Sequence, residues 1–214
     1  MELGDENIMV AVIIPTYSSL DTLKVLVQSL KNHSVYVIED GQNEETARWL
    51  QTQDVRAIYH LKNMGVAPSW NDGIKQAIQD GFTHFAVFND DIEVPENWWD
   101  VCKKEFDEGA HLVSLSAPCP QLIIRGWFFV LDKTCIDTLG LFDEQFVPFL
   151  GEDTDYEIRF MRSKLKYALV DLDVKHKSSA TLNKIKEERP EYYELVRDEN
   201  ERRLFKKYPT MVRL

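Results

Sequence analysis

The stretch that decides the fold class is Ile8-Met-Val-Ala-Val-Ile-Ile14 together with the apolar residues that follow it, Leu20, Leu23, Val27 and Leu30. The first part is an uninterrupted apolar run rich in β-branched residues, which is typical of a strand covered on both faces. The later residues recur at spacings of three and four, which predicts an amphipathic helix. These residues therefore predict a strand followed by a helix.

The same alternation continues along the first half of the chain. It predicts strands at residues 35–38, 55–59 and 82–88, and helices at 44–51 and from Pro68 to a C-terminal cap at Gly81. Strands that alternate with helices imply right-handed crossovers and a mostly parallel central sheet flanked by helices. The expected fold class is α/β.

The second half follows a looser pattern. It predicts helices at 95–107 and 153–161, a strand at 112–117, apolar stretches at 122–124 and 127–131, an extended segment at 167–170, and a charged helix from Pro190 toward Lys207. We expect a mixed sheet edge here, because the strand and helix patterns no longer alternate.

Composition excludes several classes of protein. A length of 214 residues suits one large domain, and 44% apolar residues are enough to build a core. The net charge of −11 repels a phosphate backbone, so general nucleic-acid binding is not expected. Residues 181–214 carry 9 basic and 7 acidic side chains, so the acidity belongs to the preceding part of the chain.

The cysteines and the first residues of the sequence indicate the cellular compartment in which the protein is expected. Cys102, Cys119 and Cys135 are odd in number and lack zinc-ligand spacing, so neither a disulfide framework nor a structural zinc is expected. The acidic start from Met1 to Glu6 does not resemble a secretory signal, and no apolar run approaches the roughly 20 residues that span a bilayer. These features predict a soluble, cytoplasmic protein in a reducing compartment.

Polar residues follow each of the four predicted strands of the first half. They are Pro15-Thr16-Tyr17, Glu39-Asp40-Gly41, Asn63-Met64-Gly65 and Asn89-Asp90-Asp91. In open α/β sheets ligands bind beyond the carboxyl ends of the strands. Carboxylates gathered where phosphates usually bind call for a divalent cation between them. The segment after the first strand has no G-x-G-x-x-G and no P-loop lysine, which excludes a dinucleotide fold, a P-loop enzyme and a nucleotidyltransferase with a Gly-rich basic loop.

Six strings along the chain resemble the successive signatures of family 2 glycosyltransferases with the GT-A fold. They are Ile13-Ile-Pro-Thr-Tyr, Val37-Ile-Glu-Asp-Gly, Asn63-x-Gly-x-Ala-x-x-x-Asn71-x-Gly73, Phe88-Asn-Asp-Asp-Ile, Leu139-Gly-Leu-Phe-Asp-Glu and Gly151-Glu-Asp-Thr-Asp. The matches run from about residue 9 to residue 177 in the family's order. The fourth and fifth strings look most like the branch that contains many rhamnosyltransferases.

The resemblance implies a single domain with the GT-A fold. Residues from about 9 to 115 would form a Rossmann-like half that binds a nucleotide sugar. Residues from about 116 to 180 would form the acceptor and catalytic half, and residues from about 181 to 214 a C-terminal helical tail. The chain could also be one catalytic domain of a longer transferase.

The resemblance also assigns a metal site. The segment Asn89-Asp90-Asp91 stands in the position of the family's D-x-D motif, with asparagine in the first place. Asp91 is the implied direct ligand of Mn²⁺ or Mg²⁺, with Asn89 and Asp90 beside the nucleotide sugar. His176 is the implied additional ligand, since neutral imidazole suits Mn²⁺. The alternative for residues 89–91 is a solvated turn. For the segment around His176 there are two alternatives: His176 is a surface histidine, or Lys175 and Lys177 face the diphosphate in its place.

Nucleoside recognition is implied for the loops after the first three strands. Asp40 would accept from a uracil or thymine imide N–H or from ribose hydroxyls, with Tyr17 and the backbone near Pro15 and Thr16 flanking the base. The alternatives are an ordinary turn at Asp40 and simple packing of Tyr17. Supporting roles in the loop and helix beside the nucleotide fall to Asn63, Gly65, Asn71 and Gly73.

The Glu152-Asp153 pair matches the position of the family's catalytic base. Asp153 would take the proton from the acceptor hydroxyl, and Glu152 would orient the acceptor. The alternative is structural, with Asp153 as the N-cap of the following helix and Asp155 complementing the helix dipole. The aromatic pairs Trp98-Trp99 and Trp127-Phe128-Phe129 could stack on sugars, but large aromatics in an α/β protein usually belong to the core.

These assignments predict an inverting, metal-dependent glycosyltransferase. The donor would be a nucleoside-diphosphate sugar, UDP- or dTDP-linked, and the acceptor a hydroxyl group, such as that of a growing glycan or glycoconjugate. The alternative function is a non-catalytic module of the same fold that binds a nucleotide sugar or a glycan.

Overall fold

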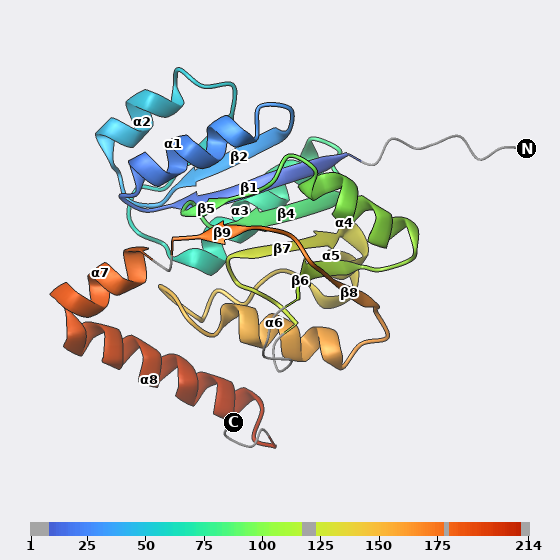
Figure 1. Ribbon diagram of the computed structural model, residues 1–214. Coiled ribbons are helices and arrows are strands. Elements are labelled where there is room, and N and C mark those ends of the chain that lie inside the picture. The colour runs from blue at the N-terminus through green and yellow to red at the C-terminus, as the bar shows by residue number, and fades with distance from the viewer. Residues whose placement is uncertain (1–8, 117–122, 178–179, 211–214) are drawn as a thin grey trace, which may run out of the picture.

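The computed structural model describes residues 9–116, 123–177 and 180–210 (Figure 1). Its elements, in chain order, are β1 (Val10–Thr16), α1 (Leu20–Ser29), β2 (Ser34–Glu39), α2 (Glu44–Leu50), β3 (Arg56–Tyr59), α3 (Val66–Gln79), β4 (His84–Phe88), β5 (Ile92–Glu93), α4 (Trp98–Asp107), β6 (Leu112–Leu115), β7 (Phe128–Asp132), α5 (Lys133–Leu139), α6 (Glu152–Met161), β8 (Tyr167–Val170), β9 (Lys175–His176), α7 (Ala180–Glu188) and α8 (Pro190–Lys207). Cys119, the acidic chain start and the predicted strand positions 8, 117 and 122 lie outside the described residues.

Within the described ranges, seven strands form one sheet in the order β3-β2-β1-β4-β7-β6-β8. The strands β1 to β4 pair in parallel, and β6 pairs in parallel with β8. Strand β7 runs antiparallel to both of its neighbours, β4 and β6. The sheet is therefore mostly parallel with a mixed second half, as the sequence predicts.

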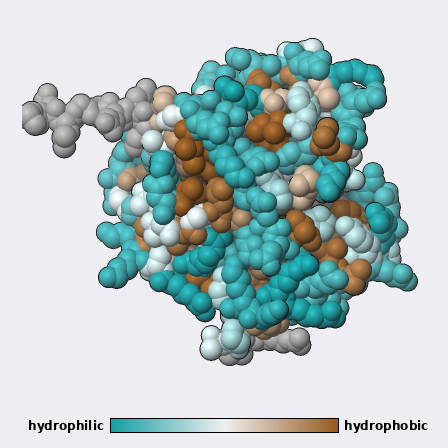
Figure 2. All heavy atoms as spheres, turned by 180° about the vertical axis from the view of Figure 1, so that it is seen from behind, coloured by the Kyte–Doolittle hydropathy of each residue, from teal (hydrophilic) through white to brown (hydrophobic). Residues whose placement is uncertain are grey.

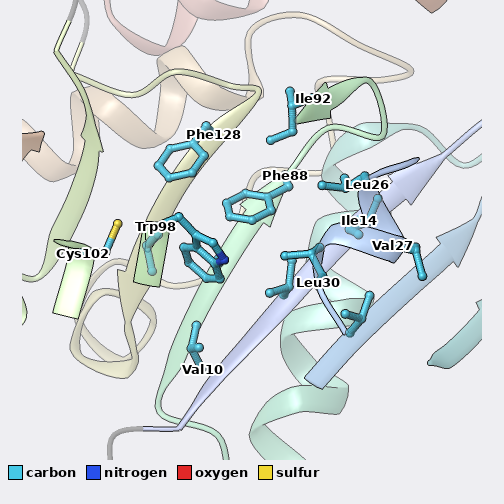
Figure 3. Packing of buried hydrophobic residues seen from close by; sticks show 14 of the residues in the cluster. Val10, Ile14, Leu26, Val27, Leu30, Phe88, Ile92, Trp98, Cys102 and Phe128 are labelled. Atoms are coloured by element: carbon cyan, nitrogen blue, oxygen red, sulfur yellow. The ribbon is translucent and has the colours of Figure 1, made fainter. Parts of the chain in front are cut away.

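Helices cover both faces of the sheet. Alternate residues of β1 belong to two separate core clusters: Val12 to the cluster packed by α1 and α4, and Ile13 to the cluster packed by α3, α5 and α6. Figure 3 shows the first cluster, in which Phe88 and Phe128 stack and Trp98 packs edge-on against Phe88. The doubly covered sheet explains why the strand sequences are continuously apolar.

The aromatic pairs divide between core and cavity. Trp98, Phe128 and Phe129 are buried in the core and Trp99 packs against it, which excludes these rings from sugar stacking. Trp127 is different, because it lines the main cavity.

Several boundaries differ from the sequence prediction. Strand β1 extends through Pro15 and Thr16, so these residues lie within the strand rather than after it. Helix α4 begins at Trp98 rather than at residue 95. The two-residue strands β5 and β9 and the helix α5 were not predicted, because elements this short leave little periodic signal, and helix α7 was expected only as part of a helical tail at about 181–214.

The C-terminal helices α7 and α8 form a pair at one edge of the molecule, with α8 beside α6 (Figure 1). Pro190 is the first residue of α8, where the missing proline N–H has no helical partner to lose. In the described part of the chain no helix is both long and apolar enough to cross a membrane. On the face shown in Figure 2, hydrophilic residues cover most of the surface and apolar residues gather in separate patches.

Candidate functional site

A cavity of about 850 Å³ opens at the carboxyl ends of the parallel strands. The loops after β1, β2, β3 and β4 line one side of it, as the rule for open α/β sheets predicts. Residues 144–153 and the helices α7 and α8 complete the wall. The polar and charged lining residues are Thr16, Tyr17, Asp40, Lys62, Asn63, Ser69, Asn89, Asp90, Asp91, Glu144, Glu152, Asp153, Arg189 and Tyr192. Asp40, Asp91 and Asp153 therefore share one cleft.

Asp40 lies at the end of β2 with 5% of its surface exposed. Its carboxyl group accepts hydrogen bonds from the backbone N–H groups of Met64 and Gly65, at 2.7 and 2.8 Å. Gly65 has φ +98°, and a Cβ there would lie 2.8 Å from the carbonyl oxygen of Pro148. The loop before α3 thus needs glycine at this position, and Asp40 holds that loop against the cleft.

His60 is a residue of this region that the motifs did not single out. Its Nδ1 lies 2.7 Å from Asp40 Oδ1, and its Nε2 lies 3.2 Å from Asp72 Oδ2. His60 follows β3 directly, so the rule that polar residues after parallel strands gather at the cleft would have found it.

Asp90 links the ends of β1 and β4. The hydroxyl of Thr16 donates a 2.7 Å hydrogen bond to Asp90 Oδ2, and both side chains are buried. Burial raises the pKa of Asp90 to about 7, and the neighbouring Asp91 adds to this. Asn89 lines the cavity, and its backbone N–H donates to the carbonyl of Trp127 at 3.1 Å.

Asp91 and His176 meet although they are 85 positions apart in the chain. Ile92 of β5 pairs with His176 of β9, and this places His176 Nε2 3.2 Å from Asp91 Oδ1. The ring of Trp127 stacks on the imidazole with centroids 4.7 Å apart. His176 itself does not line the cavity. It is connected to the cleft by its contact with Asp91, which does line the cavity.

The two lysines beside His176 do not line the cavity. The ammonium group of Lys177 lies 3.6 Å from Glu93, and Lys175 pairs with Glu93 across the strands β5 and β9. This arrangement does not support the alternative in which these lysines face a diphosphate.

The Asp91–His176 pair offers one carboxylate oxygen and one imidazole nitrogen, a donor set that suits Mn²⁺. No group of three or more His, Cys, Asp or Glu side chains arranged for a metal is found in residues 9–116, 123–177 and 180–210. A cation here would therefore take two protein ligands and need others from a bound diphosphate and water, which is a common arrangement for divalent ions at phosphate sites. The residues present fit a divalent metal of this kind.

Glu152 and Asp153 begin α6. Its N-cap is Gly151, with φ +102°, so Asp153 is the second residue of the helix and the alternative in which it serves as the N-cap is wrong. Asp153 is partly exposed to the cavity, and its Oδ1 accepts from the backbone N–H of Thr154 at 2.7 Å. Burial raises the pKa of Asp153 above that of an ordinary aspartate.

Glu152 is more deeply placed, with 6% of its surface exposed. Its Oε2 atom is buried and has no hydrogen-bond partner among the described residues. Burial, together with the charge of Asp153, raises the pKa of Glu152 well above its ordinary value. Glu152 lines the cavity, and a polar group that reached this unpartnered oxygen would satisfy it.

Gly126 and Trp127 are neighbours in the chain, and each lies close to one part of the site: Gly126 to Asp153, and Trp127 to His176 beside Asp91. A Cβ on Gly126 would lie 2.7 Å from Asp153 Oδ2, while the adjacent Trp127 stacks on His176. Sequence reasoning considered Trp127 but missed Gly126, whose only signal is its place before an aromatic run.

The remaining predicted residues divide into two groups. Pro15, Tyr17, Asn63 and Gly65 line the cavity. Asn71 lies behind the wall, where its side chain exchanges two 2.9 Å hydrogen bonds with the backbone of Phe142 and so supports the loop before α6.

The molecule thus belongs to the class of α/β proteins that place an acidic cleft at the carboxyl ends of a mostly parallel sheet. The sequence profile described as Glycosyl transferase family 2 matches residues 11–138, which is more than half of the chain. The chain belongs to this family of glycosyltransferases.

Solved structures confirm the GT-A fold. GalNAc-T7, solved with UDP, GalNAc and Mn²⁺, superposes with a TM-score of 0.67 at 15% identity, over 80% of this chain and 44% of that chain. TarS of S. aureus (residues 1–349), solved in complex with UDP, gives a TM-score of 0.60 at 15% identity, over 76% of this chain and 60% of that chain. A longer TarS structure gives 0.59, with 37% of that chain covered. The chain thus spans between about a third and three fifths of these proteins, and no curated protein matches it significantly in sequence.

Proposed function

We propose that the protein transfers a sugar from a nucleoside-diphosphate sugar, UDP- or dTDP-linked, to an acceptor hydroxyl, with divalent metal and with inversion at the anomeric carbon. The observation that carries the proposal is the shared cleft of Asp40, Asp91 and Asp153 at the carboxyl ends of the parallel strands. Family membership supports transfer of a glycosyl group, and the UDP in the TarS and GalNAc-T7 structures supports a uridine donor.

Donor binding would use the loops after β1, β2 and β4. Tyr17 and Pro15 offer a surface for the base, and Asp40 lies at the same edge. Asp40 Oδ1 already contacts the N–H of Met64 and the ring of His60, while Oδ2 accepts only from the N–H of Gly65, so the remaining lone pair of Oδ2 would accept from an imide N–H or a ribose hydroxyl.

Asp91 and His176 would hold the metal. A divalent cation there supplies positive charge that neutralises the leaving diphosphate. An imidazole that binds a metal must be neutral, so His176 would hold the cation through Nε2, the atom that lies near Asp91, while the stacked Trp127 packs on the ring.

Asp153 would act as the general base. The deprotonated carboxylate accepts the proton of the acceptor hydroxyl while the hydroxyl oxygen forms a bond to the anomeric carbon. The bond from that carbon to the diphosphate oxygen breaks on the opposite side, and the electron pair leaves with the nucleoside diphosphate. The raised pKa of Asp153 makes its carboxylate a better proton acceptor than an ordinary aspartate.

Glu152 would orient the acceptor. Its buried Oε2 can form a hydrogen bond with an acceptor hydroxyl beside the one that reacts. Such a bond fixes the attacking oxygen relative to Asp153, which lowers the entropic cost of reaching the transition state.

Release of nucleoside diphosphate tests the proposal. The full chain should release UDP or dTDP slowly from the corresponding sugar donors when Mn²⁺ is present, and Asp153→Asn should reduce transfer by about 10² to 10⁴. Calorimetry should show that Asp153→Asn still binds UDP with Mn²⁺. Asp54→Asn, at an exposed position outside the cavity, is the matched control and should keep wild-type rates. Donor binding by the wild type without any release or transfer would instead favour the non-catalytic module.

A screen of nucleotides by thermal shift tests the predicted base preference. Bound ligand raises the melting temperature by mass action, so uridine and thymidine diphosphates with Mn²⁺ should stabilise the protein. Purine nucleotides that stabilise it equally would contradict the role given to Asp40.

A further inference from the structure

The cavity has two unlike sides. One side carries Asp40, Asp90 and Asp91 with the loops after the parallel strands. The other side contains Glu152 and Asp153, and most of the rest of it is apolar: the segment 147–150, one face of α7 and the start of α8. We name this apolar part the apolar wall; its residues are Val147, Pro148, Phe149, Leu150, Leu182, Ile185 and Tyr192.

Leu150, close to the proposed base in the sequence, has a backbone conformation that is unfavourable for leucine. Leu150 has φ +71°, in the left-handed region that residues with a Cβ rarely adopt. It precedes Gly151, Glu152 and Asp153, so the strained position stands directly beside the catalytic pair. Leu150 remains partly exposed to the cavity rather than packed in the core.

Helix α7 adds the second part of the apolar wall. Leu182 and Ile185 are three positions apart, so they project from the same face of the helix, and both line the cavity. The intervening Lys184 is exposed and is not a lining residue. The helix therefore directs its apolar face toward the cleft and its charged residues away from it.

The start of α8 holds the apolar wall in place. The ring of Tyr193 stacks on Phe149 at 6.0 Å, and Tyr192 approaches the same ring at 6.4 Å. The amide of Asn200 donates to the carbonyl of Phe149 at 2.8 Å, and Asn200 is buried. Arg189 also lines the cavity here, and its guanidinium lies 4.5 Å from the centroid of the Tyr192 ring.

An aliphatic surface of this kind discriminates between ligands. Its aliphatic side chains, those of Val147, Pro148, Leu150, Leu182 and Ile185, offer no hydrogen bonds to the hydroxyl groups of a sugar, so placing several hydroxyls against them leaves those hydroxyls without partners. An alkyl chain placed there loses contact with water instead, which favours binding. The apolar wall therefore fits an apolar group better than a further sugar unit.

We infer that the acceptor carries an apolar, alkyl-like group next to the hydroxyl that reacts, and that the apolar wall binds this group. The inference rests on the proposed function and specifies the acceptor class for the same site. The apolar wall belongs to the cavity that contains Asp153 rather than to an outer face, which favours part of the substrate over a protein partner.

Binding of alkyl glycosides of increasing chain length tests the inference. The full chain is saturated with UDP and Mn²⁺, and methyl, hexyl and octyl β-glucopyranosides are titrated by calorimetry below their micelle concentrations. Each methylene that is buried should tighten binding by about fourfold. The sugar is held constant, so the series reports on the chain alone.

Three variants test whether the alkyl chain binds at the apolar wall. Leu150→Asn keeps a residue that tolerates positive φ but makes this part of the wall polar, and Ile185→Asn does the same on α7. Both substitutions should reduce the gain in affinity per methylene. Leu150→Asn still tests the inference if α7 does not form in Ile185→Asn. Lys184→Ser, on the exposed face of α7, should keep the wild-type gain.

Other results would overturn the inference. Equal affinity for the methyl and octyl compounds, or no binding of either, would show that the apolar wall does not hold an alkyl group. An unchanged gain in affinity per methylene in Leu150→Asn would place the alkyl chain elsewhere on the protein. A dimer in solution that octyl glucoside dissociates would assign the apolar wall to a second copy. Calorimetry of UDP with Mn²⁺ on the same sample separates the two proposals. If UDP does not bind, the donor site fails and the alkyl series is titrated without nucleotide; if UDP binds and the alkyl series is flat, only the inference about the acceptor fails.

Discussion

The hydroxyl of Tyr208 donates a 2.6 Å hydrogen bond to Asp155 Oδ1, which ties the end of α8 to the helix that carries Asp153. Asp155 is fully buried, and it also contacts Lys207 Nζ at 2.6 Å and Arg159 Nε at 2.9 Å. The C-terminal helix α8 therefore supports α6 through one carboxylate.

Removal of this carboxylate should destabilise the protein. Asp155→Asn leaves Arg159 and Lys207 without their shared partner, so we expect the free energy of unfolding to fall by about 3 kcal/mol, as for other buried pairs that lose one member. Urea unfolding followed by circular dichroism measures the change. Asp198→Asn on the exposed face of α8 removes a surface pair with Arg197 and should change stability by less than about 1 kcal/mol. Similar losses in both variants would contradict a special role for Asp155.

The fold was largely predictable because its first half consists of long, periodic elements. The continuous apolar run of β1 and the three-and-four spacing of α1 identify a doubly covered parallel sheet without further information. The reversed direction of β7 was not predictable in detail, because an apolar run of five residues carries no information about its direction.

The cleft was predictable in part. Asp40 and Asp91 follow strands, so the carboxyl-end rule brings them together. The meeting of Asp91 with His176 depends on the two-residue strands β5 and β9, which have no sequence signal. Asp155 was interpreted only as complementing a helix dipole, because spacing along the chain cannot show that Tyr208 reaches it.

The proposal that Asp91 and His176 hold a metal ion predicts how donor binding depends on metal. His176→Ala removes the imidazole and leaves Asp91 as the remaining member of the pair, so Mn²⁺ should stimulate UDP binding by about 10- to 100-fold less than in the wild type, by analogy with other changes around metal ligands. Calorimetry with UDP, with and without Mn²⁺, measures the difference. His33→Ala provides a control, since His33 packs against Trp98 away from the cavity. Equal Mn²⁺ stimulation in His176→Ala would exclude this residue from the metal site.

The raised pKa of Asp153 predicts the acid side of the pH–rate profile. A general base is active when deprotonated, so the rate should fall as the pH falls through this pKa. Burial raises that pKa above 3.8, so activity should be lost at a higher pH than an ordinary aspartate would give. Transfer or donor hydrolysis at saturating Mn²⁺ measures the profile, and UDP binding over the same range separates loss of the base from loss of metal. A rate that stays constant down to pH 4 while UDP remains bound would contradict the assignment of Asp153.

Gly126 allows the proposed role of Asp153 as general base to be tested without removing its carboxyl group. A Cβ at this residue would lie 2.7 Å from Asp153 Oδ2, and this oxygen is the end of a side chain that can rotate away. Gly126→Ala should therefore retain the fold while it displaces the Asp153 carboxyl group, which lowers kcat by about 10-fold or more because small misplacements of reacting groups are costly. Gly109→Ala is the converse control, since its φ of +92° strains any side chain and nothing lies within 4 Å of the added Cβ. This control should lose about 1 kcal/mol of stability and keep its kcat. If Gly126→Ala instead unfolds at lower denaturant than Gly109→Ala and retains full kcat, the close approach serves packing rather than the orientation of Asp153.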